Sequence, residues 1–286
     1  MLKYKVAKII TTSFCPRVVR ESAELTGNPL GYFSHSQKFT TPESIIDLIK
    51  LNIEKELSCD PGADVDLIIV NNDTGWKLGK SYLDDIDNIK LPRGIVRIFH
   101  RENYGRSFGG YNFAFEKLRT EYDYFIFTED DILLTKDNYA LLGIESFEKI
   151  NNCGFVAYQS LTDKSFLNLS KEDTLHAHGG VGLSSTKVLT NLYKKSGNLP
   201  YAIQETSQDY EDIIRYGEVN FTNKISKLGY RLINIPSDTK LYSYAYDEMR
   251  GITVERYATF YEKMQYFIKL YLYKIPYIRA IFRRLS

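Results

Sequence analysis

The sequence has no long apolar run, and none approaches the roughly 18 residues that a membrane-spanning helix needs. Its first segment, "MLKYKVAKIITTSF", lacks the long apolar core of a signal peptide and predicts a strand instead. Cysteine is scarce: Cys15, Cys59 and Cys153 lack the spacing of metal ligands, and their odd number predicts buried free thiols in a reducing compartment. We therefore expect a cytoplasmic protein.

An excess of charge of either sign is also missing. The 37 basic and 36 acidic residues leave a formal net charge of +1, so there is no overall attraction to nucleic acid, and we expect none as a partner. What the sequence does have is 286 residues of which 43% are hydrophobic, enough to bury a full core.

Apolar runs of strand length alternate with helical patterns in the first half. Strands are expected at 5–14, 65–73, 94–102 and 122–130, and helices at 40–57 and about 108–120. Thr41 and Pro42 provide the start of the first helix. Its expected apolar face comprises Ile45, Ile46, Ile49, Ile53 and Leu57. Continuous apolar strands separated by helices indicate an α/β fold with a mostly parallel central sheet flanked by helices.

The run "YDYFIFTEDDILL" (122–134) ends a strand on three consecutive acids, Glu129, Asp130 and Asp131. Open sheets of parallel strands bind ligands at the carboxyl ends of their strands. Adjacent carboxylates repel one another, and a divalent cation such as Mg²⁺ or Mn²⁺ relieves this repulsion. The alternative is an ordinary polar strand end that caps the next helix.

A glycine-rich loop, "ENYGRSFGGYNFAFEKL" (102–118), precedes this strand. Gly105, Gly109 and Gly110 permit close approach of backbone, and the helix that starts there offers N–H groups to an anion. Asn103 and Asn112 supply amides that could tie the loop together. The spacing differs from the dinucleotide fingerprint G-x-G-x-x-G, and a tight turn between strand and helix is the alternative interpretation.

Taken in order, "IIVNNDTG", "NYGRSFGGYNFAF" and "YDYFIFTEDDILL" resemble the nucleotide-sugar half of family-two glycosyltransferases of GT-A fold, over about residues 5–140. The matching positions are Asp73, Asn103, Gly105, Gly110, Asn112, Glu129 and Asp131. The resemblance implies a nucleoside diphosphate sugar as donor and Mg²⁺ or Mn²⁺ held by Asp131 with Glu129. The donor-binding residues expected from it are Thr11, Asp73, Asn103, Arg106, Gly109, Gly110, Glu129 and Asp130.

A fainter resemblance lies in "GEVNFTNKISKLGYRLINIP" (217–236), where Glu218 falls at the position of the family's catalytic carboxylate. Gly217 replaces the usual preceding acid, and Glu replaces the usual Asp. The expected buried helical face comprises Phe221, Ile225 and Leu228. Alternative bases just upstream are Asp209, Glu211 and Asp212.

The segment "HAHGGVGLSS" (176–185) stands where the family builds its acceptor loop, so His178, Gly179 and Gly180 are expected to line the acceptor site. His176 and His178 would instead share a face, as metal ligands could, if the segment were a strand. A purely structural turn is the third possibility. No histidine follows His178, so "LYSYAYDEM" (241–249) is expected to cover the diphosphate with Tyr or Asp247, or with nothing.

Residues 256–286 form a basic and aromatic tail with seven Lys or Arg and one Glu. Its pattern predicts an amphipathic helix, interrupted at Pro276, that lies on an anionic membrane surface. A terminal helix docked on the enzyme is the alternative. The expected organisation is a nucleotide-sugar half (1–140), an acceptor and catalytic half of the same domain (141–250), and the C-terminal tail (251–286).

Together these patterns predict an inverting, metal-dependent glycosyltransferase that acts on a glycan or lipid-linked acceptor in cell-surface polysaccharide assembly, at the inner face of the cell membrane. Processive relatives carry Gln-x-x-Arg-Trp, but the one tryptophan here is Trp76, so a single addition per binding event is expected. The rivals are a nucleotidyltransferase, although 11–21 has no glycine, and a non-catalytic nucleotide- or glycan-binding module.

Overall fold

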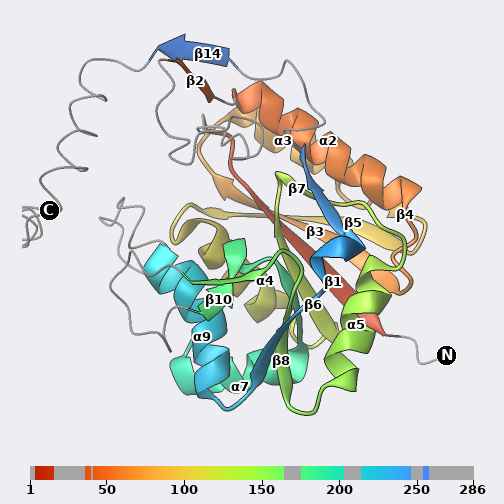
Figure 1. Cartoon of the computed structure of the whole chain (residues 1–286). Coiled ribbons are helices and arrows are strands. Elements are labelled where there is room, and N and C mark those ends of the chain that lie inside the picture. The colour runs from red at the N-terminus through yellow and green to blue at the C-terminus, as the bar shows by residue number, and fades with distance from the viewer. Residues whose placement is uncertain are drawn as a thin grey trace, which may run out of the picture. The chain divides into compact units, whose positions relative to one another are not determined.

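The computed structural model describes residues 4–15, 36–39, 41–163, 175–202, 214–245 and 254–257 (Figure 1). The chain divides into two compact units. The larger comprises Met1–Cys15 and Pro42–Met249, and the smaller comprises Pro16–Thr41 and Arg250–Ser286. None of the helices in the described ranges is long and apolar enough to cross a membrane.

An eight-stranded sheet in the order β12-β8-β11-β6-β1-β3-β5-β4 forms the centre of the larger unit. Its strands are β1 (Lys5–Thr12), β3 (Asp64–Asp73), β4 (Lys90–Leu91), β5 (Gly94–Glu102), β6 (Tyr124–Glu129), β8 (Cys153–Ala157), β11 (Gly182–Ser185) and β12 (Arg231–Asn234). β11 and β4 pair antiparallel with their neighbours, and the remaining neighbours pair in parallel. The predicted α/β fold with a mostly parallel central sheet is confirmed.

Helices cover both faces of this sheet (Figure 1). They are α2 (Pro42–Ser58), α3 (Lys77–Ile86), α4 (Arg106–Leu118), α5 (Tyr139–Lys149), α7 (Thr186–Ser196) and α9 (Asn220–Lys227). Shorter helical turns are η2 (His178–Gly180), η3 (a π-helix, Ile214–Val219) and η4 (Ser237–Thr239).

The two faces are distinguished by the alternation of side chains along β1. On one face, the ammonium of Lys8, which is fully buried, lies 2.7 Å from Oε1 of Glu56 in α2. Tyr139 of α5 donates a 2.7 Å hydrogen bond to the other oxygen of Glu56. On the opposite face, Thr11 packs against Gly110 of α4. Helices α2 and α5 therefore cover one face of β1 and α4 covers the other.

Helices α7 and α9 lie on the same side as α4, because their aromatic side chains meet. The rings of Tyr193 and Phe115 are 6.0 Å apart, and those of Phe221 and Phe108 are 5.8 Å apart. Phe221 and Ile225 of α9 are fully buried as predicted, whereas Leu228 is only partly buried.

One prediction for the first helix was wrong at its end. Leu57 is 51% exposed, because at this end the buried face of α2 passes through Glu56, which pairs with Lys8 of β1, and not through Leu57. Ile45, Ile49 and Ile53 are buried as predicted, and Ile46 is partly buried.

Three short strand pairs complete the described structure. β7 (Ile132–Leu134) pairs with β13 (Tyr242–Tyr244), and β9 (Leu161–Asp163) pairs with β10 (Leu175–Ala177). In the smaller unit, β2 (Ser36–Phe39) pairs with β14 (Val254–Tyr257). The helical interpretation of the tail is thus wrong for residues 256–257, which complete a strand. Residues 258–286 lie outside the described residues.

Candidate active site

The carboxyl ends of β1, β3, β5 and β6 lie side by side because these strands are parallel. Thr11 of β1 is in register with Val70 of β3 and with Glu129 of β6. Asp73, the last residue of β3, is in register with Glu102 at the end of β5. The predicted donor-site residues Thr11, Asp73 and Glu129 therefore share one edge of the sheet, the edge at which open α/β sheets bind ligands.

The glycine-rich loop brings the start of α4 to this edge. Gly105 caps the helix in the left-handed conformation (φ 66°), and the exposed Arg106 follows with φ 46°, which is uncommon for a residue with a side chain. A methyl group at Gly110 would lie 2.6 Å from Cγ2 of Thr11, so glycine is what lets α4 approach β1. The unpaired N–H groups of the first helical turn are consequently held near the strand ends.

The three consecutive acids separate onto different sides of the sheet. Glu129 accepts a hydrogen bond from the Ser107 hydroxyl in the first turn of α4. Asp130 is fully buried and accepts a 2.6 Å bond from the hydroxyl of Thr12 on the other face, and its carbonyl accepts a 2.8 Å bond from the Asn52 amide of α2. This placement gives Asp130 a role in joining β1, β6 and α2, so we do not place it among the donor ligands.

Asp131 follows at the turn between β6 and β7 and is half-buried. Its carbonyl accepts a 2.9 Å hydrogen bond from the N–H of Ala245, directly after β13. The segment 241–245 thus lies beside the acids, where the sequence predicted a cover for the diphosphate. Tyr244 is in register with Ile132. Asp247 lies outside the described residues.

The three acids affect the pKa of Tyr111 in α4. Burial raises the pKa of Tyr111 well above its ordinary value, and the negative charges of Glu129, Asp131 and Asp130 raise this pKa further. All three carboxylates therefore act on one buried hydroxyl, and a cation bound at this edge would reduce the repulsion among them.

The ends of β1 and β3 form a second part of the site. Asp73 accepts a 2.8 Å hydrogen bond from the N–H of Gly75, and Thr74 donates a 3.1 Å bond to the carbonyl of Phe14. The ring of Phe14 lies 5.2 Å from that of Trp76. An aromatic pair and a carboxylate thus lie together beyond the two strand ends.

Arg101 links the end of β3 to the glycine-rich loop, a role that the sequence did not reveal. Its guanidinium donates to Oδ1 of Asn72 and, at 2.6 Å, to the carbonyl of Tyr104. The guanidinium carbon lies 3.9 Å from the centre of the Tyr104 ring. A methyl group added at Gly109 would lie 3.1 Å and 3.2 Å from the two terminal nitrogens of the guanidinium. Arg101 therefore fixes the backbone on which the loop begins.

Glu218 lies in η3, with its side chain 9% exposed. Its Oε1 accepts a 2.9 Å hydrogen bond from the N–H of Gly179 and lies 3.3 Å from Nε2 of His176. The predicted base and the predicted acceptor loop are therefore in direct contact.

Phe108 of α4 joins these two segments to the glycine-rich loop. Methyl groups at Gly180 and at Gly217 would each lie 2.7 Å from the Phe108 ring, so the ring is held between η2 and η3. Because Ser107, the preceding residue, contacts Glu129, the four predicted segments meet around the first turns of α4. Neither Ser107 nor Phe108 was expected from the sequence, where both look like ordinary helix residues.

The remaining sequence expectations have mixed outcomes. His176 is fully buried in β10 and His178 is exposed in η2, so the two do not share a face as metal ligands would. Asn112 accepts a 2.8 Å hydrogen bond from the N–H of Leu199, whereas Asn103 is exposed. The alternative bases lie outside the described residues: Asp209, Glu211 and Asp212.

Two carboxylates at this edge suit a divalent cation. Glu129 and Asp131 are both partly exposed, and carboxylate oxygens are the ligands that Mg²⁺ and Mn²⁺ prefer. Across the described residues, no group of three or more His, Cys, Asp or Glu side chains comes together to hold a metal. The pair fits a cation that takes its other ligands from water and from the phosphates of a nucleotide.

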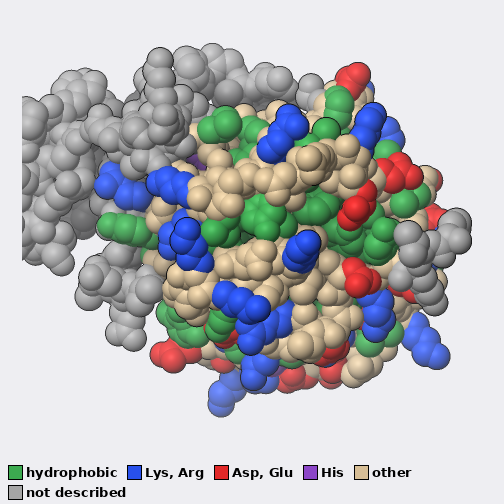
Figure 2. Space-filling model, turned by 90° about the horizontal axis from the view of Figure 1, so that it is seen from below, with side chains coloured by type: hydrophobic (Ala, Val, Ile, Leu, Met, Phe, Trp, Pro, Cys, Tyr) green, Lys and Arg blue, Asp and Glu red, His purple; other side chains and the backbone are tan. Residues whose placement is uncertain are grey.

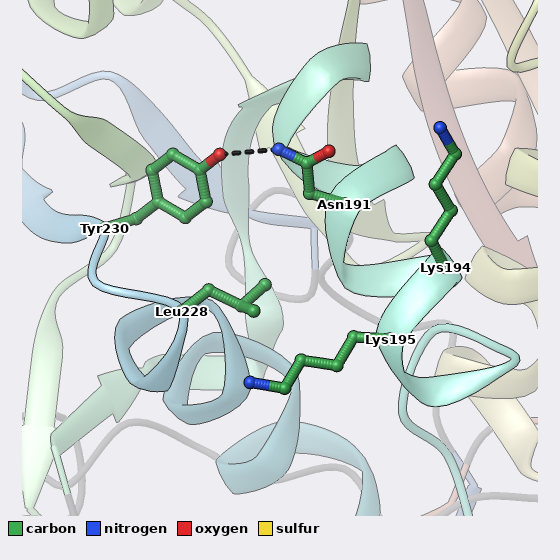
Figure 3. Close-up of a pocket in the computed structure, with 5 residues that line it drawn as sticks. All are labelled: Asn191, Lys194, Lys195, Leu228 and Tyr230. Carbon is green, nitrogen blue, oxygen red and sulfur yellow. Dashed lines mark hydrogen bonds between the residues drawn. The ribbon is translucent and has the colours of Figure 1, made fainter.

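A separate surface hollow of about 430 Å³ lies between α7 and the start of β12 (Figure 3). The Asn191 amide donates a 2.7 Å hydrogen bond to the hydroxyl oxygen of Tyr230, and Lys194 extends away from the other lining residues. Exposed Lys and Arg side chains are scattered over the face of the molecule that Figure 2 shows. β12 begins in register with Cys153, the first residue of β8, so the hollow is at the opposite edge from the candidate site.

No protein-family model matches the chain, and no curated protein matches it. The solved structures that are similar to it include the following three. S. aureus TarS is 14% identical (TM-score 0.44; 84% of this chain, 36% of that one). The mannosyltransferase PcManGT from Pyrobaculum calidifontis, in complex with GDP-Man and Mn²⁺, is 14% identical, with a TM-score of 0.44. The match covers 82% of this chain and 55% of that one. The bifunctional glycosyltransferase WbbM is 11% identical, with a TM-score of 0.43, and the match covers 82% of this chain and 39% of that one. The chain thus spans about a third to just over half of their lengths, and this degree of similarity does not establish a shared activity.

Proposed function

We propose that the protein is an inverting glycosyltransferase of GT-A fold. It transfers a sugar from a nucleoside diphosphate sugar to a hydroxyl group of a glycan or lipid-linked acceptor. The observation that carries the proposal is the meeting of four segments around the first turns of α4: the end of β6, the glycine-rich loop, the loop at 178–180, and Glu218. Such a site has an anion-binding helix start, a pair of acids and a separate carboxylate, which are the groups that this reaction requires.

The donor is proposed to bind along the carboxyl ends of β1, β3 and β6. Asp73 and the adjoining aromatic pair would hold the base, following the resemblance of "IIVNNDTG" to the family. The N–H groups at the start of α4 and the exposed Arg106 would face the diphosphate, since both favour negative charge. Thr11 and Gly110 would line the floor beneath it.

Asp131 and Glu129 would hold Mg²⁺ or Mn²⁺, which when bound would neutralise charge on the departing diphosphate. Ser107 holds Glu129 toward α4, on the same side as the proposed phosphate position. Asp130 stabilises the strand end from the other face through Thr12.

Glu218 is the proposed general base. It accepts the proton of the acceptor hydroxyl while that oxygen bonds to the anomeric carbon and the bond from this carbon to the diphosphate oxygen breaks. A positioned base typically contributes on the order of 10²–10⁴-fold. Direct attack by the acceptor, assisted by one base, inverts the anomeric carbon. His178, Gly179 and Gly180 would line the acceptor site beside it.

The cellular setting follows from the sequence. Beyond Tyr257 the chain has six basic residues and one acidic residue among many aromatics, which favours binding to an anionic membrane surface. A peripheral enzyme of the inner face of the cell membrane, adding one sugar per binding event during cell-surface polysaccharide assembly, is the setting that we propose.

A non-catalytic nucleotide- or glycan-binding module is the second candidate. It is favoured by the burial of Glu218 against His176, a pairing that also suits a purely structural carboxylate. Turnover distinguishes the two, because a binding module releases no nucleoside diphosphate from any sugar nucleotide.

The donor site is tested by thermal unfolding in the presence of a panel of nucleotide sugars and nucleoside diphosphates, with and without Mn²⁺. A ligand at 100 times its Kd stabilises the folded state by about 2.7 kcal/mol. Asp131→Asn, which removes charge but little volume, should abolish the metal-dependent part of this protection. The control is Asp85→Asn on the exposed side of α3. Equal metal-dependent protection in Asp131→Asn and wild type would contradict the proposed metal site.

A further inference from the structure

His176 is a fully buried histidine whose imidazole lies 3.3 Å from the Glu218 carboxylate. The two residues come from different elements, β10 and η3. A buried polar ring is costly unless it has a partner, and a buried carboxylate even more so. The fold has thus placed an imidazole and a carboxylate, both costly to bury, in contact with each other.

The backbone around His176 is held in place relative to Glu218. The N–H of Ala177, the next residue, donates a 3.1 Å hydrogen bond to the hydroxyl of Thr222 in α9, the helix that continues from η3. Two residues further on, the N–H of Gly179 donates to Oε1 of Glu218, the same oxygen that His176 approaches. One short segment, 176–179, therefore presents a ring nitrogen and a backbone N–H to a single carboxylate oxygen.

We infer that His176 is a positioning residue for Glu218. The Gly179 N–H hydrogen-bonds to the carboxylate and the imidazole packs against it, so together they hold the carboxylate in one orientation, in which it can accept a proton. His176 is itself inaccessible, so it acts through Glu218 rather than on a substrate. The inference rests on the proposed role of Glu218 as the base.

The arrangement also couples two tasks. The segment that orients the base continues directly into the proposed acceptor loop, His178–Gly180. The donor residues come from other elements, namely β1, β3, β6 and α4. A change at His176 should therefore lower kcat and leave donor affinity nearly unchanged, whereas a general loss of folding would affect both.

The test is a double-mutant cycle of His176→Leu and Glu218→Gln, measured as kcat and as KM for the donor. If His176 acts through Glu218, His176→Leu lowers kcat by roughly 10-fold or more in the wild type and by about 2-fold or less in the Glu218→Gln background. His176→Gln, which keeps a polar side chain beside the carboxylate, should recover part of the loss. Because His176→Leu could fail to fold, His176→Asn provides a second, polar arm of the cycle, with melting curves recorded for every variant.

His100→Leu is the matched control. His100 pairs with Asp84 at 2.9 Å between β5 and α3, in a more exposed position than His176. His100→Leu therefore removes a contact between a histidine and a carboxylate away from Glu218, and kcat should stay at the wild-type value. Equal fold-losses from the His176 variants with and without Glu218 would overturn the inference, as would an unchanged kcat in His176→Leu. Absence of any turnover by the wild type would instead contradict the proposed function. The two failures are therefore distinguishable, because the results that overturn only the inference require an active wild type.

Discussion

Gly180→Ala probes the packing at the centre of the candidate site. Gly180 has φ 67°, a conformation that costs a residue with a side chain about 1–2 kcal/mol. Its new methyl group would also lie 2.7 Å from Cε1 of Phe108, and overpacking of this kind costs about 1–3 kcal/mol. The substitution should therefore lower the free energy of unfolding by about 2–5 kcal/mol.

Two other glycines separate these contributions. Gly197, at the end of α7, has φ 77° with nothing within 4 Å of a methyl group, so Gly197→Ala should show the conformational cost alone. A methyl group at Gly217 would lie 2.7 Å from the Phe108 ring, but Gly217 is not in the left-handed region, so Gly217→Ala should show the packing cost alone.

Urea unfolding of the three variants provides the measurement. Gly180→Ala should be the most destabilised, and Phe108→Leu combined with Gly180→Ala should be less destabilised than the sum of the single changes, since the smaller side chain can yield. If Gly180→Ala costs no more than Gly197→Ala, Phe108 does not lie between η2 and η3 and the meeting of the four segments is wrong.

Two further predictions concern other parts of the chain. Burial raises the pKa of the Cys153 thiol to about 11. At pH 8 a thiol reagent should therefore label the partly exposed Cys15 and Cys59, and should label Cys153 only after unfolding. Reaction of all three thiols at one rate in the native protein would contradict this. Removal of residues 258–286 keeps all of β14 and takes away six basic residues, each of which contributes about 1 kcal/mol to binding at an anionic surface. The truncated protein should therefore lose salt-sensitive co-sedimentation with anionic vesicles and should still bind the donor. A docked helix predicts instead a lower melting temperature without lipid.

Periodicity predicted the parts of the fold that depend on neighbours in sequence. β3 and β5 lie within a residue of their predicted bounds, because a continuous apolar run needs only a covered sheet to become a strand. The acids of "EDD" were placed correctly at a strand end. Their separation was missed, although alternation along a strand already implies that Glu129 and Asp130 point to opposite faces.

Contacts between remote segments could not be predicted in the same way. Nothing in "KVAKIITT" indicates that Lys8 is fully buried, because its partner Glu56 lies on a helix whose position is fixed only by packing. The same holds for Arg101 with Asn72 and for His176 with Glu218. In the tail, a helical pattern beginning at Arg256 gave way to pairing with Gln37, a tertiary contact that overrides local preference.

The measurement that tests the central claim most directly is turnover of a nucleotide sugar by wild type and Glu218→Gln. With the donor found by thermal protection, wild type should release nucleoside diphosphate in an acceptor-dependent reaction. Glu218→Gln, which keeps a side chain of nearly the same shape beside Gly179, should bind the donor with similar affinity and lower kcat by roughly 10²-fold or more. An unchanged kcat in Glu218→Gln would show that the base lies elsewhere, and no turnover by wild type with any donor would contradict the assignment as a glycosyltransferase.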